Sequence, residues 1–331
     1  MAGRDQGNPL RQALWPLALL YGAAAALRNW TFDAGLRRAH HLRVPVVSIG
    51  NLTVGGTGKT PTVAFAAALA HARGRRPGVL ARGYGRAAGA ELNDEGAMLQ
   101  RRLPWLLQQQ DPDRVAAGER LVARGADYVL LDDGFQHRRL HRDLDVLCLD
   151  AELPFGNGLC LPAGDLREFR SGLRRAGMVL LTRAGGLAPA ALTERIARIR
   201  ELSGRRDLPV YACEHGPSDV LLQPRGEVVA LDALAGRRAV LLSAIARPAS
   251  FRATATALGV EVVAEHRHRD HHRFTEAEIA DAAAAARAAD AILLTTEKDD
   301  ARLGAAVVDR HVLRVELRFL GEPPTAAEWL L

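Results

Sequence analysis

Lysine is almost absent from this chain. Of its 44 lysine and arginine residues only Lys59 and Lys298 are lysines, so nearly all positive charge is carried by planar guanidinium groups. A lysine that persists against this bias indicates a position where a compact, mobile ammonium does what a guanidinium cannot. The composition singles out Lys59, which follows a glycine-rich stretch, and leaves Lys298 without an assigned role.

Cysteine is also scarce, and its placement excludes two kinds of site. The three cysteines, Cys148, Cys160 and Cys213, form no close-spaced pair, and their number is odd. A disulfide framework and a cysteine-based metal site are therefore not expected. The pattern is typical of a protein from a reducing compartment.

Apolar runs long enough to cross a membrane are missing. The most apolar stretch, Leu14 to Leu27, has 14 residues and would extend about 21 Å as a helix, short of a ~30 Å hydrocarbon core. Two interpretations remain open, a helix in the membrane interface and a helix buried on the core. Aromatic and basic neighbours favour the interface: Trp15, Tyr21, Arg28, Trp30, Arg37, Arg38 and Arg43.

The rest of the composition is that of a globular protein. A length of 331 residues predicts two domains, and 48% hydrophobic with 25% charged residues excludes a disordered chain. The net charge of +6 suits an anionic partner, whether nucleotide, phospholipid surface or nucleic acid. No basic and aromatic stripe accompanies it, so no nucleic-acid partner is expected.

Strands and helices alternate along most of the chain, which predicts an α/β fold with a parallel sheet flanked by helices. Short apolar runs mark the strands, and Thr275 with Glu278 forms a capping box that starts one helix. The expected strands are 44–49, 78–81, 127–131, 144–149, 178–182, 210–212, 239–244, 260–264, 292–295 and 312–317. The expected helices are 59–73, 190–202, 249–258 and 276–289, with a short apolar helix at the C-terminus.

The strongest motif follows the first of these strands and opens a helix. It comprises Thr53, Val54, Gly55, Gly56, Thr57, Gly58, Lys59 and Thr60. This is the context of a phosphate-binding loop, whose backbone N–H groups and helix N-terminus face the phosphates of ATP. We expect Lys59 to contact the β- and γ-phosphates and the Thr60 hydroxyl to bind Mg²⁺. Thr53 stands where the generic pattern has glycine.

Two adjacent acids, Asp132 and Asp133, follow the strand 127–131. A carboxylate at the carboxyl end of a parallel strand beside the phosphate-loop strand is where such proteins hold Mg²⁺. We therefore expect Asp132 and Asp133 to supply the metal site.

The motif and its surroundings resemble the tetraacyldisaccharide 4'-kinase family, over most of the chain from Val44 to Asp299. The matching strings follow in the family's order: 48–61, 82–85, 93–95, 131–137, 142–143, 155–158, 161–164, 166–168, 248–251, 270–272 and 296–299. Asn93 stands where the family often has glycine.

The resemblance implies an enzyme that transfers the γ-phosphate of ATP to the 4'-hydroxyl of a tetraacylated glucosamine disaccharide 1-phosphate, giving lipid IVA. It implies a peripheral protein on the cytoplasmic face of the bacterial inner membrane, with an acylated disaccharide lipid and an anionic membrane surface as partners. It also implies a P-loop kinase core with a second, smaller α/β lobe and an N-terminal interfacial helix.

On this basis five segments are expected: an interfacial helical segment 1–43, a kinase core 44–217, a linker 218–234, a smaller lobe 235–310 and a returning strand with a C-terminal helix 311–331. By these boundaries Asp94 belongs to the core and His271 to the smaller lobe.

Site residues follow from the same resemblance. Asp94 is implied to activate the acceptor hydroxyl, with His271, Lys59 and Asp133 as the other catalytic groups. Tyr84 and Glu168 match further active-site positions and are expected at the nucleotide. A carboxylate such as Asp94 can accept the hydroxyl proton as the transition state forms, and an imidazole can orient it or carry charge.

One alternative function and one alternative site remain. A membrane-associated P-loop ATPase switch would share the phosphate loop and both aspartates, but it would not need a second lobe that presents Asp270, His271 and His272. The histidines at 266, 268, 271 and 272 suggest a metal site, yet arginines at 267, 269 and 273 alternate with them. A basic segment facing solvent or phosphate is the preferred interpretation.

Overall fold

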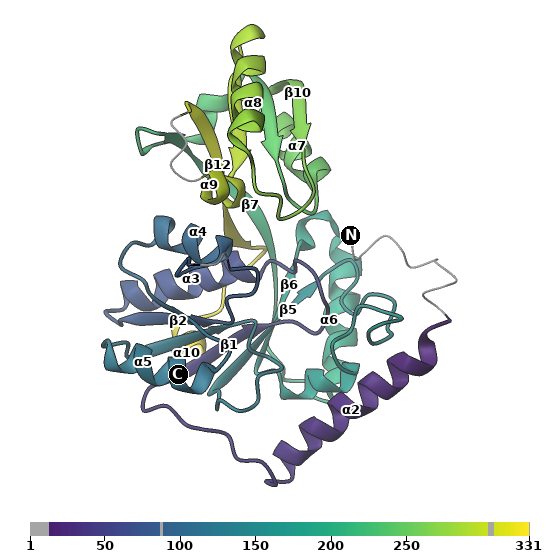
Figure 1. Cartoon of the computed structure of the whole chain (residues 1–331). Coiled ribbons are helices and arrows are strands. Elements are labelled where there is room, and N and C mark those ends of the chain that lie inside the picture. Colours follow the sequence, from purple (N-terminus) through teal and green to yellow (C-terminus); the bar gives the residue numbers. More distant parts are fainter. Residues whose placement is uncertain (1–12, 87–88, 304–307, 331) are drawn as a thin grey trace. The chain divides into compact units, whose positions relative to one another are not determined.

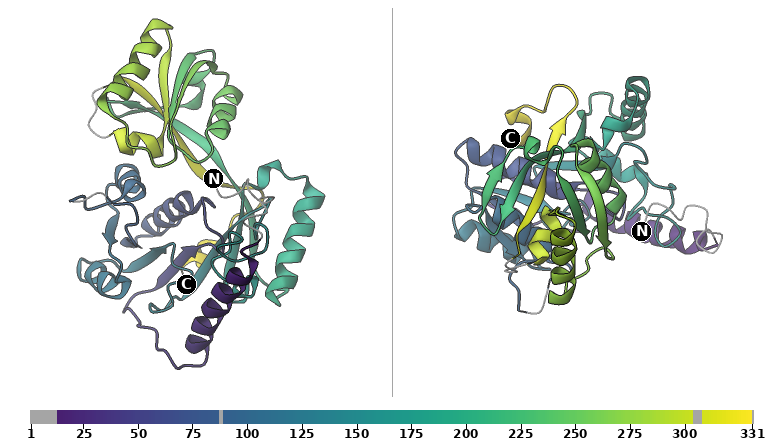
Figure 2. Two further views of the ribbon diagram at one scale, coloured as in Figure 1. Left: turned by 45° about the vertical axis from the view of Figure 1, so that its right-hand side comes forward. Right: turned by 90° about the horizontal axis from the view of Figure 1, so that it is seen from above.

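The computed structural model describes residues 13–86, 89–303 and 308–330, and the chain divides into two compact units (Figures 1 and 2). The first unit comprises Met1–Tyr84, Leu103–His215 and Leu317–Leu331, and the second comprises Gly85–Arg102 and Gly216–Glu316. Two long strands, β7 (Val210–Gln223) and β12 (Arg310–Phe319), contain residues of both units.

The first unit contains a parallel sheet in the order β3-β2-β4-β1-β5-β6-β7. Its strands other than β7 are β1 (Val46–Gly50), β2 (Pro77–Ala81), β3 (Leu107–Gln110), β4 (Tyr128–Asp132), β5 (Leu144–Asp150) and β6 (Met178–Thr182). Strands β1, β4 and β6 are buried along their whole length. Continuous burial is expected where helices cover both faces of a parallel sheet.

The helices of this unit are distributed over both faces of the sheet. Alternate residues of β4 separate the faces, because Val129 packs with α5 (Arg114–Ala123) whereas the Tyr128 hydroxyl donates to the Trp329 carbonyl of α10 (Ala326–Leu330) at 2.6 Å. Helix α3 (Lys59–Ala72) contacts α10, and α6 (Pro189–Ser203) packs with the core cluster around Leu147. Short 3₁₀ turns occur at Arg170–Arg175 and Ala184–Gly186.

The second unit has its own sheet and core. Strands β10 (Glu261–Arg267), β9 (Arg238–Ser243), β11 (Ile292–Thr296) and β12 run parallel in that order, and β8 (Glu227–Val229) pairs antiparallel with the end of β7. Its helices are α4 (Asp94–Arg102), α7 (Pro248–Ala257), α8 (Glu276–Ala288) and α9 (Glu297–Leu303), with a 3₁₀ turn at Leu231–Leu234. The capping box of Thr275 and Glu278 is present at the start of α8, as expected.

Helix α4 differs from the sequence-based boundaries, which assigned it to the first domain. Its last turn is tied to α9 by two ion pairs, Arg101 to Asp300 at 2.8 Å and Arg102 to Glu297 at 3.0 Å. Segment 85–102 therefore belongs to the second unit, and with it Asp94. The expected linker 218–234 also belongs there, since it supplies the β7–β8 pairing.

The apolar N-terminal stretch forms helix α2 (Trp15–Asp33). Only Ala18, Gly22 and Asn29 are buried, at spacings that place them on one face of the helix. A Cβ on Gly22 would lie 2.4 Å from the Phe169 ring, so this face packs directly on the first unit. No helix in the described ranges is long and apolar enough to cross a bilayer.

Most other expected elements correspond to observed ones, although β7 is much longer than the expected strand 210–212. Five elements were not anticipated: β3, α4, α5, β8 and α9. The C-terminal helix α10 belongs to the first unit, and its Trp329 side chain is fully buried. Its ring lies 5.9 Å from that of Phe65 on α3, which explains how the tail completes the first core.

Candidate active site

The phosphate-binding loop occupies residues 51–58 between β1 and α3. Gly50 ends β1 at a point where a Cβ would lie 2.6 Å from Cβ of Phe135, so only glycine allows this approach. Gly55 and Gly58 have φ values of 105° and 78°, a left-handed conformation that other residues rarely adopt. The glycines that define the motif are therefore required by its backbone.

Thr53, at the first motif position, does not share the positive φ of the loop glycines Gly55 and Gly58. It forms an isolated antiparallel bridge with Leu166, and the next N–H, that of Val54, donates to the Asp165 carbonyl at 2.7 Å. The extended backbone of such a bridge does not need glycine. This explains the departure from the generic pattern.

Hydrogen bonds within the loop and from the end of β6 hold the loop in place. The Asn51 amide donates to the Thr57 hydroxyl at 3.0 Å, and the Thr182 hydroxyl donates to the Thr57 carbonyl at 3.0 Å. Arg183 hydrogen-bonds the Gly56 carbonyl and pairs with Asp150. These contacts hold the loop carbonyls away from the side where the N–H groups would meet phosphate.

The His215 ring packs against the last residue of the loop, Gly58. A Cβ added to Gly58 would lie 1.8 Å from His215 Cε1, so the imidazole packs directly on the glycine. Burial, together with the positive charge of Arg183, lowers the pKa of His215 to about 4, against a smaller opposing effect of its hydrogen bond to the Gly58 backbone. His215 is therefore neutral at physiological pH and supports the loop without adding charge.

Lys59 and Asp133 meet at the start of α3. Lys59 Nζ lies 3.4 Å from Asp133 Oδ1, and Arg167 donates to Asp133 Oδ2 at 2.7 Å. Burial favours the protonated acid, but Lys59 and Arg167 outweigh it and lower the pKa of Asp133. Asp133 also has φ of 53°, a strained conformation for aspartate, which turns it toward these cations.

The expected metal residues lie at this same end of the sheet. Asp132 is the last residue of β4 and is buried, with a β-register that places it beside Ile49 of β1. Thr60 is the second residue of α3. The structure therefore brings the loop, Lys59, Thr60 and both aspartates to the carboxyl edge of one parallel sheet, while their roles toward phosphate and Mg²⁺ stay predictions.

Glu168 has a different environment from the one expected. One carboxylate oxygen accepts from Asn29 of α2 at 2.6 Å, and the other accepts from Gln136 at 3.0 Å and Arg175 at 2.9 Å. Its side chain is almost fully buried. Direct contact with a nucleotide is not supported by these surroundings, because both oxygens already hold α2 and the Gln136 loop in place.

Tyr84 is 85% exposed and ends the first unit. Gly83 and Gly85 on either side have φ of 72° and 71°, so a sharp turn presents the ring to solvent. The structure thus leaves Tyr84 accessible, and its nucleotide role stays a prediction.

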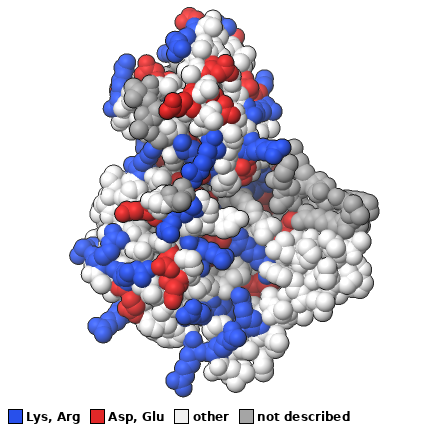
Figure 3. Space-filling model, viewed as in Figure 1, with Lys and Arg blue, Asp and Glu red and all other residues white. Residues whose placement is uncertain are grey.

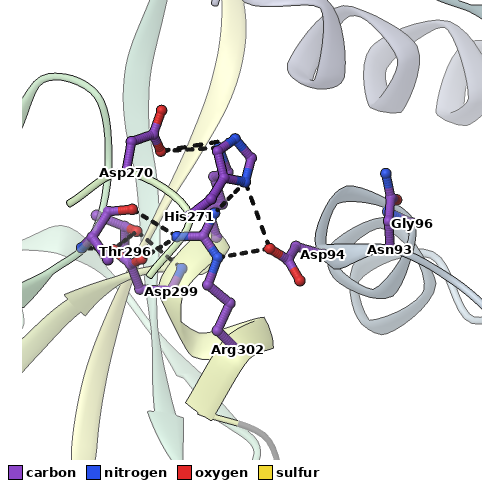
Figure 4. Close-up of polar contacts among 10 residues, drawn as sticks. Asn93, Asp94, Gly96, Asp270, His271, Thr296, Asp299 and Arg302 are labelled. Atoms are coloured by element: carbon purple, nitrogen blue, oxygen red, sulfur yellow. Dashed lines mark hydrogen bonds and ion pairs between the residues drawn. The ribbon is translucent and has the colours of Figure 1, made fainter. Parts of the chain in front are cut away.

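The second unit carries Asp94 and His271 close together (Figure 4). Asn93 caps α4, since its Oδ1 accepts from the Gly96 N–H at 3.0 Å, and this fixes Asp94 at the first helical position. His271 Nδ1 lies 3.8 Å from Asp94 Oδ2. The backbone of His271 has φ of 64°, a strained conformation held by its N–H donating to the Ala244 carbonyl at 3.2 Å.

A residue absent from the sequence-based site lies between these two. Arg302 Nε donates to Asp94 Oδ2 at 2.8 Å, and its NH2 lies 3.1 Å from His271 Nδ1. The Arg302 side chain is only 1% exposed. Its spacing of four residues from Lys298 was the one signal available, because it places both cations on one face once the segment is a helix, as α9 is.

The histidine segment forms a cluster of its own in the second unit. The His268 and His272 rings stack with centroids 4.6 Å apart, and both contact Glu278, which has ligand atoms within 4.8 Å of theirs. Glu278 Oε2 also accepts from the Thr275 backbone and hydroxyl. The capping box therefore occupies the carboxylate, and a hydrogen-bonded surface cluster describes the segment better than a metal site.

Comparisons with known proteins agree with this geometry. The family model for tetraacyldisaccharide-1-P 4'-kinase matches residues 10–331. A tetraacyldisaccharide 4'-kinase from Anaeromyxobacter sp. (strain K) is 46% identical, with 96% of this chain and 88% of that protein covered. The corresponding protein of Geobacter metallireducens is 41% identical, with 87% of each covered.

A solved structure matches as well. The "apo" form of LpxK from Aquifex aeolicus, crystallised in complex with ATP, superposes with a TM-score of 0.76 at 28% identity, covering 94% of this chain and 95% of that one. Sequence and structure thus agree over nearly the whole length, and the chain belongs to the tetraacyldisaccharide 4'-kinase family.

Proposed function

We propose that this protein transfers the γ-phosphate of ATP to the 4'-hydroxyl of a tetraacylated glucosamine disaccharide 1-phosphate, giving lipid IVA in lipid A biosynthesis. The observation that carries the proposal is the family match over residues 10–331, together with a complete phosphate loop at the carboxyl edge of the first sheet. The alternative, a P-loop ATPase switch, is not favoured, because the relatives matched over the same length are kinases.

The phosphate loop supplies the charge that phosphoryl transfer requires. Lys59 lies beside Asp133 and is positioned to exchange part of this contact for the γ-phosphate oxygens when ATP binds. Phosphoryl transfer depends mainly on placement and charge neutralisation rather than on covalent help. Lys59 and the loop N–H groups therefore carry most of the nucleotide's binding and orientation.

The same edge of the sheet fits Mg²⁺. Thr60, Asp132 and Asp133 offer the oxygen ligands that this ion prefers. Nearby, Ser48 Oγ and Asn51 Oδ1 are buried without a hydrogen-bond partner among the described residues, as expected beside a polar ligand site. When bound, Mg²⁺ would neutralise charge on the β- and γ-phosphates.

Asp94 is the proposed acceptor base. Its Oδ2 is held by Arg302, and in the described part of the chain its Oδ1 has no protein partner. A carboxylate oxygen so held can accept the proton of the 4'-hydroxyl as the bond to phosphorus forms. His271 lies beside it and is proposed to contact the reacting groups.

Helix α2 is proposed to lie on the cytoplasmic face of the inner membrane, on an anionic lipid surface. Its large side chains on the exposed face include Trp15, Leu17, Leu19, Leu20, Leu27 and Trp30, each at least 47% exposed. Figure 3 shows the helix as a stretch almost without charged side chains. Apolar surface of this kind is buried favourably at a bilayer interface, where the acylated substrate also resides.

One experiment tests the proposed activity. The protein in detergent receives radiolabelled γ-phosphate ATP with or without the tetraacyl disaccharide 1-phosphate, and lipid and nucleotide products are separated. We expect label in the lipid and ATP consumption that depends on it. ATP hydrolysis at the same rate without lipid, and no labelled lipid, would replace the kinase with the ATPase switch.

A further inference from the structure

The environment of Arg302 imposes a protonation pattern on the proposed active site. The guanidinium makes four contacts: to Asp94 Oδ2, to His271 Nδ1, to the Ala244 carbonyl at 2.6 Å and to Asp299 Oδ1 at 3.0 Å. Arginine has only N–H donors and no acceptor. Every group that it touches must therefore offer a lone pair.

This requirement constrains the imidazole of His271. A neutral imidazole has one N–H donor and one acceptor nitrogen, and which nitrogen carries the proton depends on the neighbours. Because Arg302 donates toward Nδ1 at 3.1 Å, Nδ1 must be the acceptor. The proton of the neutral ring is then on Nε2.

The other side of the ring is also faced by a cation. Lys298 Nζ lies 3.4 Å from His271 Nε2 and 3.6 Å from Asp270 Oδ1. Lysine, too, can only donate. The contact with Arg302 is the shorter one, so it decides the tautomer, and the Lys298 ammonium is then left to pair with Asp270. The Nε2–H of His271 and the Lys298 ammonium then form two adjacent donors.

Arg302 is itself rigidly positioned. Thr296 and Asp299 lie at the junction of β11 and α9, where the Asp299 N–H donates to the Thr296 hydroxyl at 3.2 Å and that hydroxyl donates to Asp299 Oδ2 at 2.8 Å. Asp299 also accepts from the Ala244 N–H at 3.2 Å, at the end of the adjacent strand β9. A buried guanidinium with four of its five N–H groups bonded in such a network has one orientation.

We infer that Arg302 is a positioning residue for the transfer reaction: it holds Asp94 by Oδ2, leaving Oδ1 as the proton acceptor, and fixes His271 as the Nε2–H tautomer. His271 is thereby a donor toward an anionic oxygen of the substrates rather than the base. This assignment rests on the proposed function for its catalytic meaning, but the tautomer is a property of the protein alone.

The tautomer is measured directly in the lipid-free protein. Histidine labelled with ¹⁵N is observed by long-range ¹H–¹⁵N correlation at about pH 8, where an ordinary imidazole is neutral. The His271 signal is identified by its loss in His271→Gln. We expect a protonated Nε2 and an unprotonated Nδ1. A protonated Nδ1 in the wild-type protein would overturn the inference, whatever the variants do.

Variants of Arg302 test whether this residue fixes the tautomer of His271. In Arg302→Met, Nδ1 is released to take the proton and donate to Asp94, so the tautomer should change. Arg101→Met is the matched control, because Arg101 also ties α4 to α9 but contacts Asp300 rather than Asp94 or His271. In Arg101→Met, the His271 tautomer should be that of the wild type. An unchanged tautomer in a folded Arg302→Met protein would contradict the role of Arg302.

Kinetics separate positioning from general stability. Arg302→Met should lower the kcat of lipid phosphorylation by about 100-fold, the loss typical of a misplaced reacting group. The KM for ATP should change by less than about threefold. Arg302→Lys keeps the charge but cannot hold two partners in a fixed fork, so it should restore little turnover. Recovery of most turnover in Arg302→Lys would overturn the inference, since charge alone would then suffice.

Failure of the proposed function would look different. If the wild-type protein phosphorylates no disaccharide lipid, the kinase assignment falls, while the ¹⁵N measurement still decides whether Arg302 fixes the His271 tautomer. If lipid is phosphorylated but Nδ1 carries the proton, only the positioning role is lost.

Discussion

Lys59 differs in chemistry from every other permanently cationic side chain of the first unit, all of which are arginines. It is that unit's lone lysine, and its ammonium lies 3.4 Å from Asp133 at the N-terminus of α3. A guanidinium is larger and planar, and Arg167 already occupies the other oxygen of Asp133. The site therefore has room for a compact charge at this one position.

We expect Lys59→Ala to lose most single-turnover phosphoryl transfer, because the migrating group loses its charge partner. Lys59→Arg should recover little of it. Arg73→Ala, at the exposed C-terminal end of the same helix, is the control and should behave as wild type. Near-normal transfer in either Lys59 variant would remove the assignment of the nucleotide site.

His215 makes the first unit sensitive to acid. Its pKa is lowered from the ordinary 6.5 to about 4 in the folded protein, mainly by burial. As pH falls from 6.5 toward 4, the unfolded chain takes up a proton that the folded chain refuses, so stability is lost over this window. The contribution is at most about 3 kcal/mol.

The comparison variant is His215→Asn, which does not titrate. Denaturant unfolding of both proteins at neutral and mildly acidic pH should show a smaller acid-induced loss in the variant. Some loss should remain, because burial lowers the pKa of His137 to about 4 as well. Equal pH dependence in the two proteins would show that His215 is not held neutral against the loop.

At the scale of elements, helix α2 has a narrow buried face and an exposed apolar face. The Gly22 face packs on Phe169, and Asn29 reaches Glu168, whose partner Gln136 also donates to the Asn51 carbonyl at the start of the phosphate loop. The opposite face remains apolar and exposed. The buried stripe partly confirms the interpretation as a helix packed on the core, while the interface interpretation stays a prediction.

Substitution of the exposed face tests its membrane role without removing the helix. Replacing Leu20, Leu27 and Trp30 by glutamine should reduce association with anionic vesicles by roughly tenfold or more, since each loses apolar burial in the interface. The melting temperature should change little because none of these side chains is buried.

A second triple variant is the control. Leu153, Val228 and Leu320 are also exposed, at 47%, 51% and 40%, but lie outside α2. Their replacement by glutamine should leave vesicle sedimentation unchanged. Equal binding by all three proteins would exclude α2 as the membrane contact.

At the scale of the whole molecule, chemistry is divided between the two units. The phosphate loop, Lys59 and the two aspartates proposed to bind Mg²⁺ belong to the first unit, while Asp94, His271 and Arg302 belong to the second. The residues proposed for phosphate binding and for acceptor activation therefore sit on different hydrophobic cores.

This division predicts that variants of the second unit affect phosphoryl transfer to the lipid but not the affinity for MgATP. Asp94→Asn and His271→Ala should each lower transfer to the lipid by orders of magnitude, while MgATP affinity stays within a few-fold, because neither residue belongs to the phosphate loop. The double variant should lose less than the product of the single losses, since both contact Arg302 and act as a unit. Single-turnover rates and nucleotide binding of the four proteins provide the test. Strictly multiplicative losses, or a large loss of ATP affinity in His271→Ala, would contradict the shared role.

Local pattern was sufficient for much of this protein. The strand before Gly50, the glycines of the loop and the helix from Lys59 are specified by neighbouring residues, because the loop backbone needs glycine where φ is positive. The acids after β4 follow from the rule that parallel strands end at one edge. The position of the loop and of both aspartates at one edge of the first sheet could therefore be predicted from the sequence, while their roles stay predictions.

Contacts between segments far apart in the sequence decided where Asp94 and Glu168 lie. The sequence by itself determined that His271 follows a strand and lies before a capped helix, but not which core the segment with Asp94 joins. Arg101, Arg102 and Arg302 settle this through partners about 200 residues away, with sequence separations of 199, 195 and 208. Ion pairs of this kind leave no periodic signal in a chain so rich in arginine. Only the tertiary structure therefore decided that Asp94 joins His271 in the second unit, and that Glu168 accepts a hydrogen bond from Asn29 of α2.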